Sequence, residues 1–373
     1  MRIGIDAKRA FMNQSGLGVY NRMLILGLRE FYPEHDLFLY TPKQRISFLK
    51  ENHSIQIIEP TNFIYKKISP LWRSFKITDS LIEHDIDVYH GTSAELPFNI
   101  GRFKGKKVVT IHDLIFEHYP EFYAAIDRRM YRYKTKKACR DADAIITVSN
   151  QTKMDLVNLY GVSASKIEII PLPVDSRFTS IRNEEKLKKT ADKYVIDKPF
   201  ILCVNSFNPR KNQLKLVEAF AQSKLSADYE LILIGRGTTY LEEVHNLIRN
   251  KNLIGVRILT TVDDAELIDF YQAASLFVYP SLYECYGLPI VEAMACGTPV
   301  VCSNISSMPE VGVDAVGYFN PHEAASIRSS MEEVLESQEL KTARIHRGLD
   351  IVQKEYGLKM FVDRTMKVYK RNR

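Results

Sequence analysis

The sequence predicts an α/β protein made of two consecutive doubly wound domains, each built around a parallel sheet. Short β-branched and apolar runs alternate with helical patterns along the chain, which is typical of parallel α/β sheets. The alternation pauses at a polar, lysine-rich stretch, residues 181–194, and then begins again. A chain of 373 residues with a hydrophobic content of 45% is large and apolar enough to form two cores.

The first half of the chain carries the first alternating series. Strands are predicted at residues 2–6, 36–41, 55–59, 86–90, 107–111, 144–148 and 167–170. Helices are predicted at residues 17–31, 71–83, 121–140 and 150–159. The series ends at Pro171-Leu172-Pro173, and the lysine-rich stretch that follows is predicted to be a linker or a surface helix. We therefore expect a first domain over residues 1–178.

The second half repeats this pattern. Strands are predicted at residues 200–205, 230–234, 256–259, 276–279 and 299–302. Helices are predicted at residues 212–223, 238–250, 263–273 and 289–296. We expect a second domain over residues 195–355, followed by a tail, residues 356–373, whose apolar residues have amphipathic helical spacing. Doubly wound sheets bind ligands at the carboxyl ends of their strands, so we expect a site in the cleft between the two domains.

The composition indicates the compartment and argues against a metal site. The five cysteines are scattered and several lie in apolar strands, which predicts buried thiols in a reducing compartment. The nine histidines form no His-x₃-His spacing and no Cys-x₂-Cys pair occurs, so no metal is predicted. The chain begins with a strand rather than a signal peptide, and no apolar run approaches the length of a membrane span. These features predict a soluble cytoplasmic protein.

The excess positive charge is concentrated in one predicted helix. Residues 1–180 contain 26 Lys and Arg against 20 Asp and Glu, a balance of +6, while the remainder contains 25 of each. The helix at 121–140 holds seven of these cations, interleaved with Tyr131 and Tyr133: Arg128, Arg129, Arg132, Lys134, Lys136, Lys137 and Arg140. Such a face is compatible with anionic lipid headgroups, and a solvated helix surface is the alternative. Nucleic acid is not predicted as a partner, because no binding motif accompanies the charge.

Two glutamates near the end of the second series have the pattern of a ligand site. Glu284 and Glu292 bracket Gly287-Leu288-Pro289, which follows an apolar strand and opens a short helix. Proline suits a first helical turn, and the free amides and dipole of a helix N-terminus suit a phosphate. Carboxylates only accept hydrogen bonds, so beside an anion site they fit the hydroxyls of an attached sugar. The alternative is a capped surface helix with solvated glutamates.

Two adjacent cations, Arg210 and Lys211, follow the first strand of the second half. They precede a predicted helix for which Asn212 is a candidate N-cap. Cations are electrostatically misplaced at a helix N-terminus, where the helix dipole is itself positive. A bound anion would remove the conflict, so the pair favours diphosphate binding, with two solvated side chains as the alternative.

The segment from Pro280 to Pro299 resembles the glutamate–seven–glutamate signature of the retaining, nucleotide-sugar-dependent glycosyltransferase family 4. The resemblance extends over nearly the whole chain. It implies the GT-B fold, in which two Rossmann-like domains face each other across a cleft and a C-terminal helix crosses back to the first domain. Cys285 and Tyr286 stand where this family usually has Gly-Phe, so the pocket wall beside the donor sugar is expected to differ.

The resemblance implies roles for the residues that match. Arg210 and Lys211 would hold the donor diphosphate, and Glu292 would bind the ribose hydroxyls. Glu284 and His112 would orient the donor sugar, with His112 followed by Asp113 at the end of a predicted buried strand, as in the family. For a lone histidine at this position, a structural role is the alternative.

Further residues would complete the donor pocket. Tyr286 and the amides near Gly287 and Leu288 would line it. A glycine loop with Gly16 and Gly18, preceded by Ser15, would close over the donor phosphates. The sequence departs from the family at two places, with Val19 in place of an arginine and Asn205 in place of a glycine.

Other polar and aromatic residues are interpreted separately. Asp85-x-Asp87 and Asp141-x-Asp143 have the spacing of a metal-binding Asp-x-Asp, but both precede a strand and are expected to cap its entry end. His90 ends a strand and is a candidate for lining the acceptor side. Trp72, the single tryptophan, lies in a segment from Phe63 to Phe75 whose aromatics and lysines are candidates for contact with a lipid or glycan acceptor. Trp72 itself is expected to pack in the core.

The resemblance implies a retaining, metal-independent glycosyltransferase without a cofactor. It would transfer a hexose from a nucleoside-diphosphate sugar to a glycan or lipid-linked acceptor in cell-surface polysaccharide synthesis, such as lipopolysaccharide or capsule. The subfamily pattern favours GDP-mannose. The protein would be cytoplasmic, with peripheral contact to an anionic membrane at its inner face. Alternatives are a GT-B-fold sugar-nucleotide epimerase or phosphorylase, or a non-catalytic sugar-nucleotide-binding protein.

Overall fold

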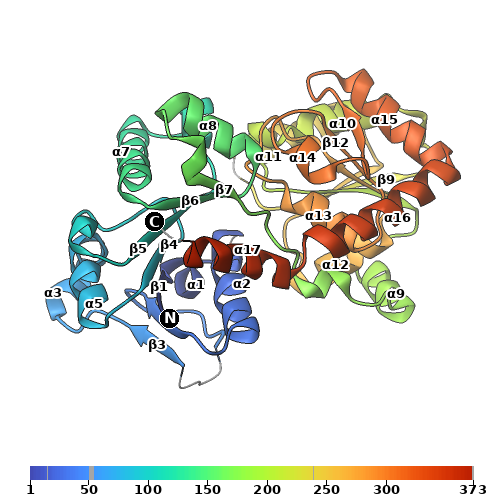
Figure 1. Cartoon of the computed structure of the whole chain (residues 1–373). Coiled ribbons are helices and arrows are strands. Elements are labelled where there is room, and N and C mark those ends of the chain that lie inside the picture. Colours follow the sequence, from blue (N-terminus) through green and yellow to red (C-terminus); the bar gives the residue numbers. More distant parts are fainter. Residues whose placement is uncertain (15, 50–53, 238, 372–373) are drawn as a thin grey trace. The chain divides into compact units, whose positions relative to one another are not determined.

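A computed structural model describes residues 1–14, 16–49, 54–237 and 239–371 (Figure 1). The chain divides into two compact units, the first formed by Met1–Pro173 with Leu358–Arg373 and the second by Val174–Gly357. Each unit is an α/β structure around a parallel sheet, as the sequence predicts. The expectations for Ser15, for Thr238 and for the last two residues of the tail lie outside the described residues.

The described part of the first unit contains a seven-stranded parallel sheet in the order β3-β2-β1-β4-β5-β6-β7. The strands are β1 (Arg2–Asp6), β2 (Asp36–Tyr40), β3 (Ile55–Ile58), β4 (Val88–Gly91), β5 (Lys106–Ile111), β6 (Ala144–Thr147) and β7 (Ile167–Ile169). The order turns back between β1 and β4, which makes this pair the topological switch point of the sheet. The strands are apolar on both sides because helices cover both faces of a doubly wound sheet.

The helices of the first unit connect successive strands. They are α1 (Lys8–Met12), α2 (Gly16–Phe31), α3 (Phe63–Lys67), α4 (Ser69–Leu71), α5 (Ile77–Glu83), α6 (Ile115–His118), α7 (Ala125–Asp141) and α8 (Asn150–Tyr160). A π-helical turn, η1 (Trp72–Lys76), joins α4 to α5. Trp72 is buried in a cluster with Phe38, Tyr40 and Tyr89, so its predicted packing role is confirmed.

The Asp-x-Asp pairs lie at the amino ends of strands, where the sequence places them. Asp87 accepts a hydrogen bond of 2.8 Å from the amide of Arg2, and Asp143 accepts one of 2.8 Å from the amide of Lys107. Asp87 therefore satisfies the amide of the first residue of β1, and Asp143 that of the second residue of β5. This geometry confirms the capping role for Asp87 and Asp143, whereas Asp85 forms an ion pair with Arg2 and Asp141 with Lys137 and Arg140.

The C-terminal helix α17 (Leu358–Lys370) packs in the first unit, against α2. Phe361 is buried there, with its ring 5.5 Å from that of Tyr20. Gly27 of α2 permits this approach, because a Cβ atom there would lie 2.4 Å from Val362 Cγ2. The tail is thus part of the first unit's core although it follows the second unit in sequence.

A buried polar chain also holds α17. His90 Nδ1 lies 2.7 Å from the Tyr369 hydroxyl, and His90 Nε2 lies 2.7 Å from Thr110 Oγ1. Lys106 of β5 donates hydrogen bonds to the carbonyls of Val368 and Arg371, the latter at 2.5 Å. Burial lowers the pKa of His90 to about 3. The expectation that His90 lines the acceptor side is wrong, because its side chain is fully buried and both ring nitrogens have partners.

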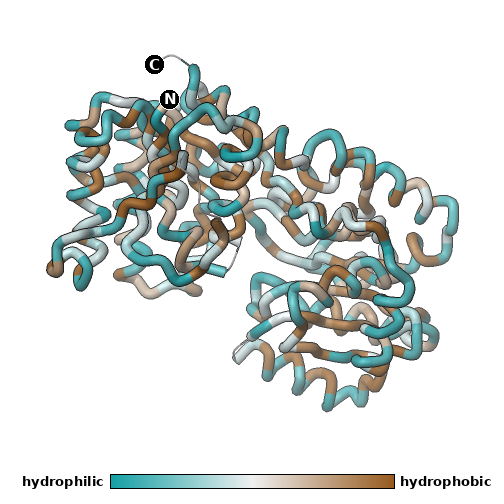
Figure 2. Tube along the Cα trace, turned by 90° about the horizontal axis from the view of Figure 1, so that it is seen from below, coloured by the Kyte–Doolittle hydropathy of each residue, from teal (hydrophilic) through white to brown (hydrophobic). Residues whose placement is uncertain are grey.

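The second unit contains, in its described residues, a six-stranded parallel sheet in the order β10-β9-β8-β11-β12-β13. The strands are β8 (Phe200–Val204), β9 (Glu230–Ile234), β10 (Val256–Leu259), β11 (Leu276–Tyr279), β12 (Val300–Ser303) and β13 (Gly317–Phe319). The helices are α9 (Glu184–Tyr194), α10 (Gln213–Ala221), α11 (Thr239–Asn250), α12 (Asp264–Ala273), α13 (Leu288–Ala295), α14 (Met308–Gly312), α15 (Ala324–Glu336) and α16 (Gln338–Glu355). Figure 2 shows hydrophobic residues concentrated along the strands of both units.

The lysine-rich stretch forms helix α9, the second of the two predicted possibilities. Asn183 caps it by accepting from the amide of Lys186 at 3.0 Å. Thr190 donates to Asp269 of α12 at 2.7 Å, which ties α9 to the second unit. The sequence interpretation did not identify β13, α14, α15 and α16.

The cysteines are free thiols. Cys139, Cys203 and Cys302 are buried, as predicted, whereas Cys285 and Cys296 are partly exposed. Burial raises the pKa of the Cys139 and Cys203 thiols to about 12, which makes them unreactive at neutral pH. None of the helices in the described ranges is both long and apolar enough to cross a bilayer.

Truncating Phe361 tests the packing of α17. We expect Phe361→Ala to lower the free energy of unfolding by about 3–5 kcal/mol, because the change leaves a cavity in a closed core. The matched control is Met360→Ala on the exposed side of the same helix, which should change this free energy by about 0.5 kcal/mol or less. Urea denaturation measures both. Equal effects of the two variants would contradict the packing described here.

Candidate active site

Arg210 and Lys211 lie in a tight turn after the carboxyl end of β8. The turn is a 3₁₀ helix, Pro209–Lys211, that ends at Asn212, whose φ of 59° is in the left-handed region. The Asn212 side chain donates to the carbonyls of Pro280 and Pro321, at 3.1 and 2.8 Å. The prediction that this side chain caps α10 is therefore wrong. Asn212 does precede the helix, but its amide fixes the turn against two other loops instead.

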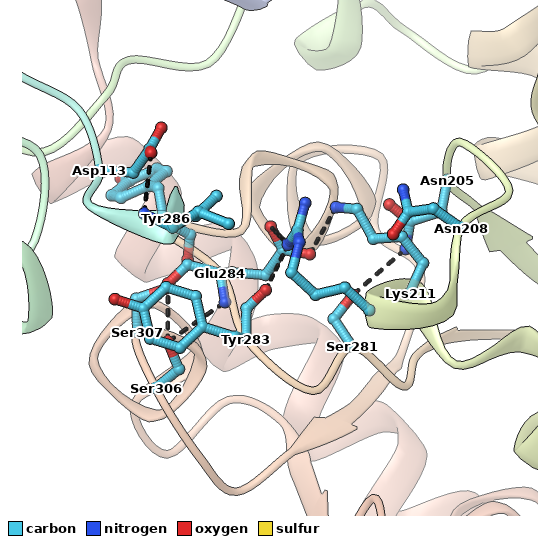
Figure 3. A network of polar contacts seen from close by, with 12 residues as sticks. Asp113, Asn205, Asn208, Lys211, Ser281, Tyr283, Glu284, Tyr286, Ser306 and Ser307 are labelled. Carbon is cyan, nitrogen blue, oxygen red and sulfur yellow. Dashed lines mark hydrogen bonds and ion pairs between the residues drawn. The ribbon is translucent and has the colours of Figure 1, made fainter. Parts of the chain in front are cut away.

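Both cations of this turn contact one carboxylate (Figure 3). Lys211 Nζ lies 2.5 Å from Glu284 Oε1, and Arg210 Nη1 lies 3.0 Å from Glu284 Oε2. Arg210 also donates to the carbonyl of Tyr283, and its own carbonyl accepts from the amide of Leu282 at 2.8 Å. The sequence-predicted residues Arg210, Lys211 and Glu284 thus come together from loops that follow β8 and β11.

The environment of this cluster favours an anion. Burial lowers the pKa of the Lys211 ammonium, Glu284 opposes this effect and Arg210 adds to it. Burial would raise the pKa of Glu284, but Lys211 and then Arg210 overcome this and hold it at about 2. Glu284 is therefore ionised at neutral pH. Two cations against one carboxylate leave a surplus positive charge, which a bound anion would compensate.

Tyr279 lies next to the cluster. Lys211 Nζ lies 3.3 Å from the Tyr279 hydroxyl and 5.5 Å from the centre of its ring. The tyrosine ends β11 and is buried, so it limits the positions that the lysine ammonium can adopt. Asn205, which replaces the family's glycine, donates to Ser281 Oγ at 3.4 Å on the same side of the sheet (Figure 3).

Two serines after β12 hold the backbone of the Glu284 loop (Figure 3). Ser306 Oγ donates to the Glu284 carbonyl at 2.7 Å and accepts from the Glu284 amide at 3.2 Å. Ser307 Oγ lies 3.0 Å from the Glu284 carbonyl and 2.7 Å from that of Tyr286, so its hydroxyl can donate to either. Sequence reasoning missed both serines. Their position after a strand's carboxyl end was a usable signal.

The Gly287-Leu288-Pro289 turn opens α13 as predicted. Gly287 has a φ of 111°, a conformation that favours glycine, and Pro289 lies in the first helical turn. The Ile290 amide donates to the Gly287 carbonyl at 2.9 Å, and the dipole of α13 makes the potential at this end positive. Tyr286 is buried, with its ring 6.3 Å from that of Tyr356.

Glu292 lies one turn inside α13 and differs from Glu284 in its protonation. Burial raises its pKa to about 7, the hydrogen bond of 2.9 Å from the Tyr271 hydroxyl opposes this, and Asp175 adds to it. The carboxyl therefore titrates near neutral pH. The two glutamates of the motif can serve different purposes, because one is a permanent anion and the other changes charge in the physiological range.

The remaining predicted residues belong to the first unit. His112 follows β5 and is buried, with Nε2 3.0 Å from the carbonyl of Thr92 and its ring 4.7 Å from that of Tyr20. Burial lowers its pKa to about 4, so the ring is neutral at pH 7. A carbonyl only accepts, so Nε2 carries the hydrogen and Nδ1 is left as an acceptor.

The two glycines at the start of α2 have different surroundings. A Cβ atom on Gly18 would lie 1.8 Å from the carbonyl oxygen of Asn13, so only glycine fits there. Gly16 has open space at the same position. Gly18 is therefore required by the local packing, whereas Gly16 leaves the start of α2 accessible.

No three His, Cys, Asp or Glu side chains among the described residues are grouped so as to hold a metal ion. The charge available to bind an anion at this site comes from the side chains of Arg210 and Lys211.

Sequence models of two families match the chain. The family described as Glycosyltransferase Family 4 matches residues 14–178, and that described as Glycosyl transferases group 1 matches residues 185–349. O-antigen chain mannosyltransferase B of Escherichia coli is 31% identical over 288 residues, which cover 76% of this chain and 74% of that protein. Serotype-specific mannosyltransferase WbdA of Escherichia coli is 32% identical over 237 residues, 62% of this chain but only 29% of WbdA.

Solved structures share the fold. A glycosyltransferase from Rickettsia africae superposes with a TM-score of 0.75 at 18% identity, over 99% of this chain and 97% of that one. WaaG, a glycosyltransferase involved in lipopolysaccharide biosynthesis, superposes with a TM-score of 0.71 at 16% identity over the whole of both chains. At these identities the likeness concerns the fold alone.

The pH dependence of stability tests the state of Glu292. A carboxyl whose pKa is raised in the folded state favours folding while it is protonated. This contribution is lost as the pH rises from the pKa in the unfolded state, about 4.3, through the pKa in the folded state, about 7. We expect wild-type protein to lose stability over this window relative to Glu292→Gln, whose amide does not titrate. The difference is at most a few kcal/mol, at about 1.4 kcal/mol per unit between the two pKa values.

Melting temperatures measured across this window provide the readout. Glu243→Gln, an exposed change on α11, is the control and should keep the wild-type pH profile. A Glu292→Gln profile that follows the wild type at every pH would show that Glu292 does not titrate as described.

Proposed function

The chain belongs to glycosyltransferase family 4 and is a glycosyltransferase of the GT-B fold, and from this premise we propose its substrates and mechanism. The proposed reaction is the transfer of a hexose, with retention, from a nucleoside-diphosphate sugar to a hydroxyl of a glycan or lipid-linked acceptor. The proposed binding of a nucleoside-diphosphate donor rests on one observation, the contact of Arg210 and Lys211 with the single carboxylate of Glu284.

The donor sugar and the pathway are proposed from the relatives. Two of them, at 31 and 32% identity, are named as mannosyltransferases, one of them of the O-antigen chain. We therefore favour mannose as the sugar, GDP-mannose as the donor and a cell-surface polysaccharide as the product. The match to WbdA spans less than a third of that larger protein, so it supports only the chemistry of one transferase module.

Charge stabilisation is the main physical requirement of the reaction. Breaking the anomeric bond builds negative charge on the departing diphosphate and positive charge on the sugar ring. Arg210 and Lys211 are held in place before the donor binds, so they can meet that negative charge without reorganisation. In this proposal the diphosphate takes over contacts that Glu284 now makes, and the carboxylate turns to the sugar hydroxyls. The cationic side chains supply the charge that a metal would otherwise provide.

The other matching residues are assigned to binding and orientation. Glu292 accepts from the ribose hydroxyls in its ionised form, which is about half populated near pH 7 and predominates at higher pH. Neutral His112 offers Nδ1 to a hydroxyl of the donor sugar, and the Gly16 loop encloses the phosphates. Tyr286 and the amides of Gly287 and Leu288 line the pocket. Retention is proposed from the family, through attack on the same face of the sugar, with no covalent nucleophile assigned.

The location of the protein is part of the same proposal. An acceptor on a lipid carrier would require the enzyme to work at the inner face of the membrane. The basic helix α7 supports peripheral contact of the first unit with anionic lipid.

A donor panel identifies the reaction. Purified protein is titrated with GDP-, UDP- and dTDP-sugars by calorimetry, and each donor that binds is incubated with a mannose-terminated acceptor. Formation of a glycosidic product supports the proposal. An epimerised donor, or a product that forms only with added phosphate, would indicate the epimerase or phosphorylase. Binding without turnover would indicate a non-catalytic protein.

Removing the Lys211 ammonium tests the donor site. We expect Lys211→Ala to lower kcat/KM for transfer by about 10²–10³-fold, the usual loss for one preorganised contact of about 3–4 kcal/mol to developing charge. Lys215→Ala on the neighbouring helix α10 is the matched control, because that half-exposed lysine pairs with Glu218 and should matter little. Transfer at wild-type rate by a folded Lys211→Ala variant would refute the assigned role.

A further inference from the structure

A segment of the first unit exposes large apolar side chains. Phe63, Ile64, Ile68, Leu71 and Phe75 are 68, 59, 45, 43 and 45% exposed, along α3, α4 and η1. The helices α3 and α4 have no buried residues, and within this segment Trp72 is the residue that reaches the core. Five solvent-exposed, large apolar side chains within one short segment indicate an interaction surface rather than isolated exposed residues.

Helix α7 exposes a second apolar group in the same unit. Ile126, Met130 and Tyr133 are 75, 49 and 59% exposed, and their spacing of four and three residues places them on one face of the helix. The residues that α7 buries, Thr135 and Ala138 among them, lie in its second half. The N-terminal half of α7 is therefore an exposed amphipathic helix.

The two groups are connected through Phe98. The rings of Phe75 and Phe98 are 5.7 Å apart, and those of Phe98 and Tyr133 are 6.1 Å apart. The amide of Phe98 donates to the carbonyl of Ser74 at 2.7 Å, which fixes η1 beside the loop that carries Phe98. In Figure 1, α3 lies at the lower left and α7 at the upper left of the first unit. We call these two groups together the apolar–basic surface.

Cations outnumber carboxylates on this surface. From Phe63 to Lys76 the chain has four cations and no carboxylate, although Arg73 pairs with Asp6 and Glu95 and Lys76 pairs with Asp79. Helix α7 has seven cations, with Asp127 exposed near its start and Asp141 at its end. Lys66, Lys67 and Arg129 are exposed, and Lys67 Nζ lies 4.6 Å above the ring of Phe63. Apolar anchors flanked by long cationic side chains are typical of a segment that lies at a lipid interface.

Ion pairs within the first unit reduce the number of α7 cations that are available to bind lipid phosphates. Arg132 pairs with Glu117, Lys134 with Glu95, and both Lys137 and Arg140 with Asp141. In the described chain, Arg129 has no carboxylate partner and lies at the edge of the apolar face. The sequence interpretation, which counted all seven cations of α7, therefore overstated their electrostatic contribution. It named the segment from Phe63 to Phe75 as a candidate for lipid contact but did not connect it with α7.

We propose that the apolar–basic surface docks the first unit onto an anionic lipid bilayer. The side chains of Phe63, Ile64, Ile126 and Met130 enter the boundary between headgroups and acyl chains. Lys66, Lys67 and Arg129 meet the lipid phosphates. This inference deepens the membrane contact proposed above and adds the segment 63–75 as its main apolar anchor. Charge complementarity selects a bilayer over a second copy of the chain, because two copies of this surface would repel.

Vesicle binding tests the proposal. Wild-type protein is co-sedimented with vesicles of equal parts phosphatidylglycerol and phosphatidylcholine, and with vesicles of phosphatidylcholine alone. We expect binding to the anionic vesicles, weakened by salt. Ile64→Ser with Ile68→Ser, and Ile126→Ser with Met130→Ser, should each weaken it by roughly tenfold or more. Lys66→Gln with Lys67→Gln should weaken binding and reduce its salt dependence.

The matched control changes equally exposed residues outside the surface. Ile181→Ser with Ile254→Ser replaces isoleucines that are 95 and 94% exposed in the second unit and should bind vesicles like wild type. The proposal would be overturned if both surface variants bound anionic vesicles as strongly as the wild type. It would also be overturned if the wild-type protein did not bind anionic vesicles. A variant that instead changes the molar mass in light scattering would show that the surface covers a second copy, and would also overturn it.

Donor calorimetry on the same samples separates this proposal from the proposed function. The surface variants should bind donor sugar-nucleotide like wild type, because the residues changed lie outside the donor site. Loss of vesicle binding with donor binding intact supports the surface. Absence of donor binding in the wild type would refute the proposed function and leave the vesicle result to be judged separately.

Discussion

The second unit depends on one buried electrostatic arrangement, in which the Glu284 carboxylate is shared between Lys211 and Arg210. Taking three charged groups out of water is costly unless each is paired. Here each cation forms an ion pair with the carboxylate, and Arg210 also donates a hydrogen bond to the Tyr283 carbonyl. The arrangement keeps Glu284 ionised and holds both cations at the carboxyl end of the sheet before any ligand arrives. The surplus positive charge is the reason why we propose this cluster as an anion site rather than a structural ion pair.

Backbone restraints from three separate loops hold that arrangement. The left-handed conformation of Asn212 and its two side-chain hydrogen bonds fix the turn after β8. Ser306 and Ser307, after β12, hold the loop after β11 that carries Glu284. These loops meet because parallel strands β8, β11 and β12 are neighbours, with their carboxyl ends at one edge. The donor site proposed for this glycosyltransferase is thus a product of sheet order as much as of the charged residues themselves.

Local pattern was sufficient for most of the fold and for the members of the candidate site. Buried parallel strands are short apolar runs between breaker residues, so β8 to β12 could be located from sequence. The region after β12 was not resolved in this way. Its strand β13 is three residues long, and α15 and α16 follow one another with only Ser337 between them. Asn212 and His90 were misassigned because each has a side chain whose partners lie far away in sequence.

The sequence by itself determined the two alternating α/β series, the opening of α13 at Gly287 and Pro289, and the presence of two cations after a strand. Periodicity and backbone preference are local properties, so a window of a dozen residues contains them. Only the tertiary structure decided that Glu284, 73 residues beyond Lys211, receives both cations, that Glu292 titrates near neutral pH, and that His90 belongs to the core. Desolvation and ion pairing depend on which distant segments pack together, and no local window of the chain records that.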